Sequence, residues 1–202
     1  MCERNAQKTG GMSMKKRFAI AGASGRGFLS YGYPLSPKVD KAGVDVFGYG
    51  EEAADKEKIV QVSELVGVYD INPGRARYVG QVLSAPAYDD FDKMIEEARP
   101  DCVIVATADY SHVDYVVRAL DMGCEVFCEK PMCINAEQCR AILEAEKRNN
   151  RKIGICFNMR YDNVILQLKQ IMDSGVLGKI YNVNFEWLLS KDYSCAIRKH
   201  FS

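Results

Sequence analysis

The chain has 202 residues, of which 48% are hydrophobic and 27% are charged, and its 27 basic side chains balance 27 acidic ones. That length predicts one or two domains with enough core to fold without a disulfide or metal staple. A formal charge of zero excludes the strong basic field of a general nucleic-acid binder. No apolar run approaches the roughly 20 residues of a membrane helix. We therefore expect neither nucleic acid nor a membrane as a partner.

Eight cysteines are many for a chain of this length. Cys102 lies inside an apolar, strand-like run, as a small buried hydrophobe does in a reducing compartment. Cys124, Cys128, Cys133 and Cys139 lack the C-x-x-C pair that zinc and iron–sulfur sites favour. The chain also shows no secretory signal. We therefore expect a cytoplasmic protein without a metal site.

The first part of the chain combines a polar leader, a buried strand and an irregular insertion. Residues 1–14 are mostly polar and contain glycine, so we expect a disordered leader. A short apolar run at 18–21 predicts a buried strand, and a helix is expected from Phe28 onward. Prolines and glycines interrupt residues 34–60, which predicts an inserted surface loop with a short helix near 51–59.

Beyond the insertion, strand-like runs alternate with helical segments. Residues 102–107 are apolar at nearly every position, as in a strand covered on both faces of a parallel sheet. Ser111 is expected to cap the next helix, with Asp114 as its capping-box partner. The other expected strands are 64–70, 125–128 and 152–157, and the expected helices are 75–83, 91–98, 112–122 and 136–149. This alternation predicts an α/β fold, a doubly wound parallel sheet of the Rossmann type.

The pattern changes after Asn158. Residues 162–174 predict a helix, and residues 180–189 alternate as in an antiparallel strand with one packed face. Too little chain remains to complete a domain. We therefore expect a nucleotide domain at 15–158, followed at 159–202 by the truncated start of a second α/β domain.

A glycine loop, Gly22-Ala23-Ser24-Gly25-Arg26-Gly27, lies between the first strand and the first helix. Its backbone N–H groups and the helix N-terminus can face a pyrophosphate, with Gly22 allowing the tight turn and Gly27 close helix packing. Ser24 replaces the middle glycine of the G-x-G-x-x-G pattern, where its side chain either crowds the pyrophosphate or donates a hydrogen bond to it. The alternative is an ordinary strand-to-helix turn.

Asp70 ends the second expected strand, where an acidic side chain can accept hydrogen bonds from the adenosine ribose. It lies further beyond the loop than the usual roughly 20 residues, and the insertion at 34–60 accounts for the excess. Its charge repels a 2′-phosphate and so favours NAD over NADP, although Arg75 and Arg77 blur that preference. The alternative is a turn aspartate that caps Asn72-Pro73-Gly74.

Five segments in register resemble the glucose–fructose oxidoreductase, inositol dehydrogenase and rhizopine catabolism (Gfo/Idh/MocA) family over about residues 17–190. They are the glycine loop with Ala21 before it, Tyr69 to Pro73, Ala106 to His112, Cys128 to Pro131, and Asn158 to Tyr161. The Glu-Lys-Pro element is the most specific. The resemblance implies an NAD(P)-binding Rossmann domain, an α/β second domain, and hydride transfer between a nicotinamide and a secondary alcohol of a sugar or cyclitol.

The resemblance also implies roles for single residues. Lys130 would face the substrate, where its ammonium favours the alkoxide-like charge that develops as hydride leaves. Glu129 would lie near the nicotinamide ribose, and Pro131 would follow a cis peptide bond. The other family positions are Thr107, His112 and Asn158 toward the cofactor, and Arg160 and Tyr161 toward the substrate.

Simpler alternatives stay open for these residues. Lys130 can be a surface lysine before a turn proline, His112 a first-turn helix residue, and Arg160 with Tyr161 inter-domain packing. Members of the family usually carry an Asp–His pair with the histidine as proton acceptor, whereas the histidines here are His112 and His200. The sequence thus leaves two functions: an NAD(P)-dependent dehydrogenase, homo-oligomeric in its full-length form, or a non-catalytic NAD-binding module.

Overall fold

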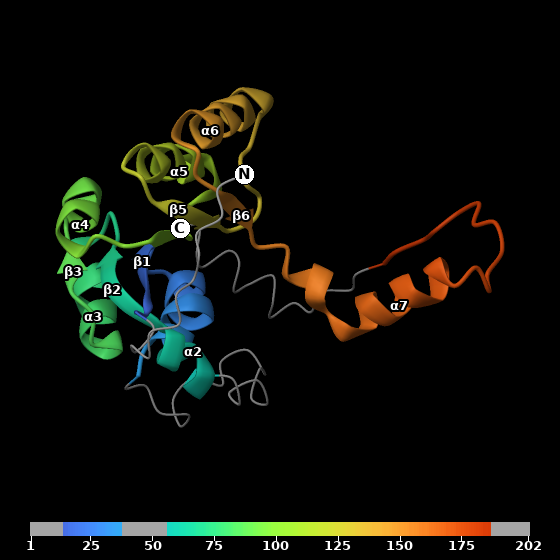
Figure 1. Ribbon diagram of the computed structural model, residues 1–202, viewed down its shortest axis with the longest axis horizontal. Helices are drawn as coiled ribbons and strands as arrows, with labels where there is room; N and C mark the ends of the chain where they lie inside the picture. Colours follow the sequence, from blue (N-terminus) through green and yellow to red (C-terminus); the bar gives the residue numbers. More distant parts are fainter. Residues whose placement is uncertain (1–13, 38–55, 187–202) are drawn as a thin grey trace, which may run out of the picture. The chain divides into compact units, whose positions relative to one another are not determined.

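The computed structural model of the chain describes residues 14–37 and 56–186. The chain divides into two compact units, Met1–Ile155 and Cys156–Ser202. The described part of the first unit contains a six-stranded sheet with helices against both faces (Figure 1). Its strands are β1 (Lys16–Ala21), β2 (Ser63–Tyr69), β3 (Ala87–Tyr88), β4 (Cys102–Val105), β5 (Glu125–Cys128) and β6 (Ile153–Ile155).

The strand order is β3-β2-β1-β4-β5-β6, and every neighbouring pair is parallel. The chain runs outward from β1 to β3, returns to β4 beside β1, and then runs outward again to β6. This reversal creates a switch point between β1 and β4. The doubly wound, Rossmann-type sheet expected from the sequence is confirmed.

Alternate side chains of the strands pack on opposite faces of the sheet. Ala19 and Val103 have no exposed surface and pack on one face, whereas Ile20 and Ile104 are buried on the other. The first face is covered by α4 (Phe91–Ala98), α5 (His112–Asp121) and α6 (Ala136–Asn149), and the second by η1 (Arg26–Gly32), α1 (Tyr33–Leu35), α2 (Lys56–Val62) and α3 (Pro73–Leu83). β4 is buried on both faces, as its continuous apolar sequence predicts.

The segment after the glycine loop differs from the expectation. The helix expected from Phe28 begins at Arg26 as the π-helix η1, which continues into α1. α2 begins at Lys56, within the expected 51–59, and runs beyond it. The leader before Met14 and residues 38–55 of the expected insertion lie outside the described residues. The short strand β3 has too few residues for an apolar pattern to predict it.

The capping box expected at Ser111 is wrong. Its side chain caps no N–H group of α5, and its Oγ instead lies 2.8 Å from Ala108 O and 3.0 Å from Thr107 Oγ1. A 3-10 turn, η4 (Asp109–Ser111), precedes α5 and gives Ser111 a helical backbone conformation. An N-cap side chain needs extended backbone to turn back toward the helix, so the hydroxyl faces the preceding turn.

The second unit contains a 3-10 turn, η5 (Asn158–Tyr161), and the helix α7 (Asn163–Asp173). The side chain of Asp162 accepts hydrogen bonds from two N–H groups in the first turn of α7. The strand expected at 180–189 is wrong over 180–186, which carry no strand, and the rest lies outside the described residues. A strand needs a neighbour to pair its backbone groups, and the described part of this unit offers none.

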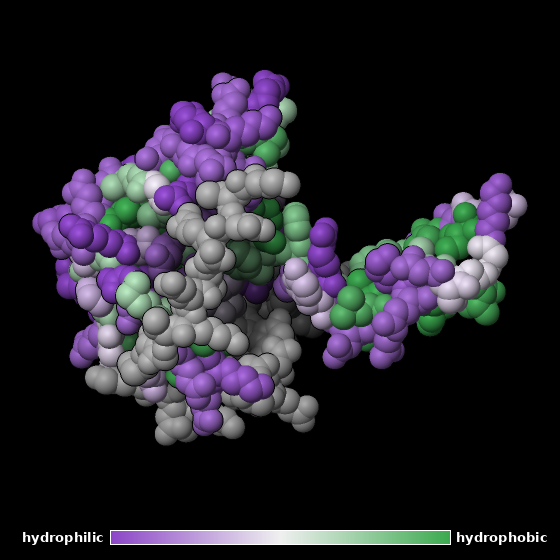
Figure 2. Space-filling model, in the orientation of Figure 1, coloured by the Kyte–Doolittle hydropathy of each residue, from purple (hydrophilic) through white to green (hydrophobic). Residues whose placement is uncertain are grey.

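Hydrophobic side chains line α7, whereas the face of the first unit in view is largely hydrophilic over its helices (Figure 2). Within the second unit no residue of α7 is buried. Among the helices in the described ranges, none has the length and apolar character needed to cross a membrane.

Candidate functional site

Hydrogen-bond register aligns the carboxyl ends of four neighbouring strands. Ala21 of β1 pairs with Tyr69 of β2 and with Val105 of β4, and Val105 pairs with Cys128 of β5. The segments that follow these residues therefore leave the sheet at one edge, on both sides of the switch point. Ligands of doubly wound sheets bind in the crevice at this edge. Four of the five sequence segments singled out above meet here.

Gly22 and Gly27 let the loop, the helix and β4 approach one another closely. Gly22 has a φ of 98°, and a Cβ added there would overlap the backbone carbonyl of Ala106. A Cβ added at Gly27 would overlap the carbonyl oxygen of Gly22. The tight turn and close packing expected of these two glycines are therefore confirmed. Ser24 closes the turn into the helix, because its carbonyl oxygen accepts a hydrogen bond from Phe28 N at 2.8 Å.

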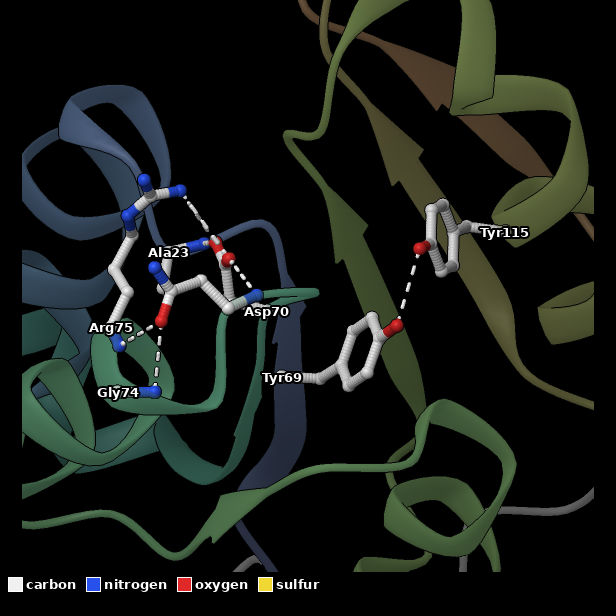
Figure 3. A network of polar contacts seen from close by, with 7 residues as sticks. Ala23, Tyr69, Asp70, Gly74, Arg75 and Tyr115 are labelled. Carbon is white, nitrogen blue, oxygen red and sulfur yellow. Dashed lines mark hydrogen bonds and ion pairs between the residues drawn. The ribbon is translucent and has the colours of Figure 1, made fainter.

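Asp70 is buried between the glycine loop and the start of α3 (Figure 3). Its Oδ2 accepts a hydrogen bond from Ala23 N at 2.8 Å, and its Oδ1 accepts one from Asn72 N at 2.8 Å. The guanidinium of Arg75 reaches the same carboxylate, with Nη1 3.3 Å from Oδ1. Asp70 therefore joins the loop to the turn before α3, so the turn role that the sequence left open is present. Its contact with a ribose stays a prediction.

His112 ties the loop after β4 to the loop after β5. Its ring is buried at the start of α5, with Nδ1 2.8 Å from Pro131 O and Nε2 3.1 Å from Thr107 O. Both ring nitrogens therefore face backbone carbonyl groups rather than the crevice. His112 acts on the site by holding these two loops together, and the first-turn helix position that the sequence left open is also correct.

The Glu-Lys-Pro segment leaves β5 with its glutamate buried and its lysine exposed. Oε1 of Glu129 accepts a hydrogen bond from the Tyr31 hydroxyl at 2.6 Å and lies 3.4 Å from Arg26 Nε. Oε2 accepts one from Lys130 N at 3.1 Å. The Lys130–Pro131 peptide bond is cis, as the resemblance implied. Arg26 and Glu129, predicted separately, are thus brought together.

Tyr31 belongs to this cluster, although sequence reasoning missed it. It follows Arg26 by five positions on η1 and points its hydroxyl at the same carboxylate oxygen. An α-helical period places residues five apart on different sides of a helix, so the apolar pattern carries no signal for this pair. A tyrosine one π-turn beyond the loop arginine would have been the signal.

Asn158, Arg160 and Tyr161 lie on η5 in the second unit. The guanidinium of Arg160 lies over the ring of Phe157, with 5.7 Å between the guanidinium carbon and the ring centroid. The structure groups these three predicted residues on one turn. Their contacts with nicotinamide or substrate stay predictions.

The buried thiols of the first unit resist ionisation. Burial raises the pKa of Cys102 and of Cys128 to about 12, and that of Cys124 to about 11. Metal ligation needs the thiolate, so these groups behave as small hydrophobes. Within residues 14–37 and 56–186 no cluster of three or more His, Cys, Asp or Glu side chains is arranged to hold a metal ion.

A cavity of about 520 Å³ lies on the face of the sheet that η1 and α1 cover. Its lining is mainly apolar and includes Phe18, Ile104 and Phe127. Lys16 and Glu125, at the amino ends of their strands, also line it. None of the residues predicted for the site lines it, but Tyr31, whose hydroxyl donates to Glu129, does.

Comparisons with known proteins match the part of the chain that forms the parallel sheet. Residues 16–157 match the Gfo/Idh/MocA family, described as an oxidoreductase family with an NAD-binding Rossmann fold. Inositol 2-dehydrogenase of Salmonella paratyphi B is 37% identical over 119 residues, which cover 57% of this chain and 35% of that protein. Inositol 2-dehydrogenase of Gluconacetobacter diazotrophicus is 36% identical over 151 residues, or 70% of this chain and 44% of that one.

Solved structures agree with this match. An inositol dehydrogenase homologue from Azotobacter vinelandii, complexed with NADH and myo-inositol, superposes with a TM-score of 0.64 at 25% identity, covering 84% of this chain and 42% of that chain. Myo-inositol 2-dehydrogenase from Lactobacillus plantarum superposes with a TM-score of 0.66 at 22% identity, covering 82% and 43%. This chain thus spans less than half the length of each of these relatives.

Proposed function

Since this chain belongs to the Gfo/Idh/MocA oxidoreductase family, whose Rossmann domain binds NAD, we propose that it functions as part of an NAD-dependent dehydrogenase that acts on a sugar or cyclitol. The reaction would move a hydride between the nicotinamide and a secondary alcohol. One observation carries the proposal: the glycine loop, Asp70, Thr107 and the Glu-Lys-Pro segment leave the sheet at one aligned edge.

The residues at this edge suit a dinucleotide. Gly22 and Gly27 let the loop pack closely against the segment after β4 and against η1. N–H groups of a glycine loop at a helix N-terminus bind pyrophosphate. Asp70 would accept hydrogen bonds from the adenosine ribose, with its charge favouring NAD over NADP. Arg26 would lie beside the phosphates at the start of η1. NAD, when bound, supplies the hydride acceptor that no side chain can provide.

Lys130 is our candidate for the acid–base group. Its side chain is exposed, and its backbone N–H donates a hydrogen bond to Glu129 Oε2. An ammonium beside the reacting hydroxyl stabilises the negative charge that develops on oxygen. Lys130 Nζ would accept the hydroxyl proton when the alcohol is oxidised and return it to the substrate oxygen when the carbonyl is reduced. Arg160 and Tyr161 would bind the other hydroxyl groups. The proposed substrate class follows the inositol dehydrogenases that this chain resembles.

We also propose a cytoplasmic location and a homo-oligomeric full-length form. The six described cysteines are all free, which agrees with a reducing compartment. A second candidate function, which the sequence leaves open, is an NAD-binding module without turnover.

The test is a titration of the chain with NADH and NADPH, followed by nicotinamide fluorescence. We expect saturable binding that prefers NADH. Assays with NAD and a panel of sugars and cyclitols, myo-inositol included, then separate the two candidates. Turnover that Lys130→Met lowers at least about a hundredfold, a typical effect for a lost acid–base group, supports the dehydrogenase. NADH binding without turnover supports the module, and binding of neither nucleotide refutes both.

A further inference from the structure

Glu129 connects two elements that are far apart in the sequence. Its residue is only 6% exposed, and a carboxylate buried to that degree needs partners on its oxygens. Oε1 takes the Tyr31 hydroxyl at 2.6 Å and faces Arg26 Nε at 3.4 Å, both from η1. Oε2 takes the backbone N–H of Lys130 at 3.1 Å. One carboxylate therefore joins the helix after the glycine loop to the backbone of the candidate acid–base residue.

The π-helical form of η1 makes this double contact possible. Arg26 and Tyr31 are five residues apart, and each α-helical residue turns about 100°, so an α-helix would point them roughly 140° apart. A π-helix closes i→i+5 hydrogen bonds and brings residues at that spacing to nearly the same side. η1 covers Arg26 to Gly32 and so includes both residues. Such turns occur frequently at functional sites.

The packing around η1 fixes Tyr31 in this position. Its ring lies edge-on to Phe127 of β5, with 5.8 Å between the centroids and 78° between the planes. Gly27 and Gly32, within the same helix, would overlap their neighbours if they carried a Cβ, so η1 cannot move outward without losing close contacts. Tyr31 thus packs its ring on β5 and donates its hydroxyl hydrogen just beyond the end of that strand.

We propose that Tyr31 and Arg26 are positioning residues for Lys130, which act through the Glu129 carboxylate. The proposal rests on the function proposed above, because it matters only if Lys130 faces a substrate. It adds that η1, the helix after the glycine loop, also positions the backbone of Lys130. The glycine loop with η1 and the Glu-Lys-Pro segment, which a sequence pattern treats as separate motifs, then act together.

The two partners contribute unequally. The Arg26 side chain is 40% exposed and its Nε lies 3.4 Å from Glu129 Oε1, so solvent and salt screen this ion pair. The hydrogen bond from Tyr31 is short and partly buried. We therefore expect Tyr31→Phe to change the exchange rate of the Lys130 amide more than Arg26→Gln does. Only the change caused by Arg26→Gln should become smaller at high salt.

Amide hydrogen exchange of the full chain, followed by NMR, tests the proposal without requiring turnover. Tyr31→Phe removes the hydroxyl and keeps the ring against Phe127. The Lys130 amide donates its hydrogen bond to Glu129 Oε2. We expect this amide to exchange at least about tenfold faster, which is the factor that corresponds to the loss of a hydrogen bond to a charged group. The Glu129 amide, bonded to Val105 O at 2.9 Å, is the internal control and should be unchanged.

A matched variant and a double mutant complete the test. Tyr78→Phe changes a tyrosine of α3 that is 63% exposed and should leave both amides unchanged. Glu129→Ala should accelerate the Lys130 amide, and adding Tyr31→Phe to it should have no further effect. In an active preparation, Tyr31→Phe should lower kcat and leave the Kd for NADH unchanged. Equal Lys130 exchange in Tyr31→Phe and the unaltered chain refutes the positioning role, whereas absent NADH binding refutes only the proposed function.

Discussion

Arg75 faces Asp70 at the position where cofactor preference is expected to be set. Its Nη1 lies 3.3 Å from Oδ1 and 3.4 Å from Oδ2, and its side chain is 48% exposed (Figure 3). A carboxylate alone repels a 2′-phosphate, and the adjacent guanidinium reduces that repulsion. The NAD preference inferred from Asp70 is therefore weakened by a cation that the same site supplies.

We expect Arg75→Gln to sharpen the preference for NADH. The ratio of the Kd for NADPH to the Kd for NADH should rise by roughly twofold to fivefold, the range for a half-exposed ion pair. Arg77→Gln removes the same charge from the next exposed arginine of α3 and is the matched control, with a smaller effect expected. Fluorescence titrations with both nucleotides give the ratio. An unchanged ratio in Arg75→Gln would show that Arg75 does not face the 2′ position.

Gly27 carries the close approach of η1 to the glycine loop. An added methyl group would overlap the carbonyl oxygen of Gly22, which is backbone and cannot move aside without shifting the loop. We expect Gly27→Ala to lower the free energy of unfolding by about 1–3 kcal/mol and to weaken NADH binding at least tenfold. Gly74→Ala is the control, because its Cβ would meet only the side chain of Asn72 at 3.2 Å. Urea unfolding and NADH titration check both variants.

The strand pattern and the spacing pointed to the glycine loop and Asp70, whereas Thr107, Glu129 and Lys130 were named from the resemblance to the family. Asp70 and Glu129 each follow a predicted strand, and register then aligns them. Tyr31 could not be predicted, because a π-turn changes which residues share a helix face and leaves no apolar signature. The contacts of His112 with Pro131 and Thr107 were equally hidden, since they join two loops through backbone atoms.

At the scale of elements, burial and period predicted the strands and long helices well, and local chemistry predicted less. β4 and α6 were predicted from their apolar patterns with nearly their observed bounds. Ser111 failed as a cap because the 3-10 turn before it fixes a helical backbone there. The strand expected at 180–189 is absent over 180–186, because alternation alone does not supply a pairing partner.

The thiols within β4 and β5 make an element-scale prediction about alkaline stability. The folded chain keeps Cys128 protonated up to a pKa of about 12, against an ordinary value of 9.0. Between pH 9 and pH 12 the unfolded chain releases the thiol proton and the folded chain retains it. The contribution of this thiol to the free energy of unfolding is therefore fully present below pH 9 and falls as pH rises toward 12. Urea unfolding from pH 8 to pH 11 should show this decline.

Cys128→Ala isolates the contribution of one thiol. Its loss should reduce the decline by up to about 1.4 kcal/mol for each pH unit above 9. Cys102→Ala should do the same, because burial raises the pKa of that thiol to about 12 as well. Curves for the variants that run parallel to that of the unaltered chain across pH 9–11 would contradict the prediction.

At the scale of the whole molecule, the core that the described residues form belongs to the first unit. Among residues 14–37 and 56–186, three clusters of buried apolar side chains, with the partly buried ones packed on them, extend from Phe18 to Ile155. In the second unit, no side chain of α7 is buried. The family match, which ends at residue 157, marks nearly the same boundary. The sequence pattern predicts a domain boundary after Asn158, and that assignment stays a prediction.

A chain that ends at Phe157 should therefore fold as the intact one does. Because the m-value scales with the surface exposed on unfolding, the main urea transition should keep its m-value and midpoint after the second unit is removed. Binding of NADH should also persist, since the loop glycines and Asp70 remain. Any loss of affinity would measure the contribution of residues 158–202 as a whole, which include Asn158, Arg160 and Tyr161. A lower midpoint, with a smaller m-value, would mean instead that the first unit draws part of its core from residues beyond Phe157.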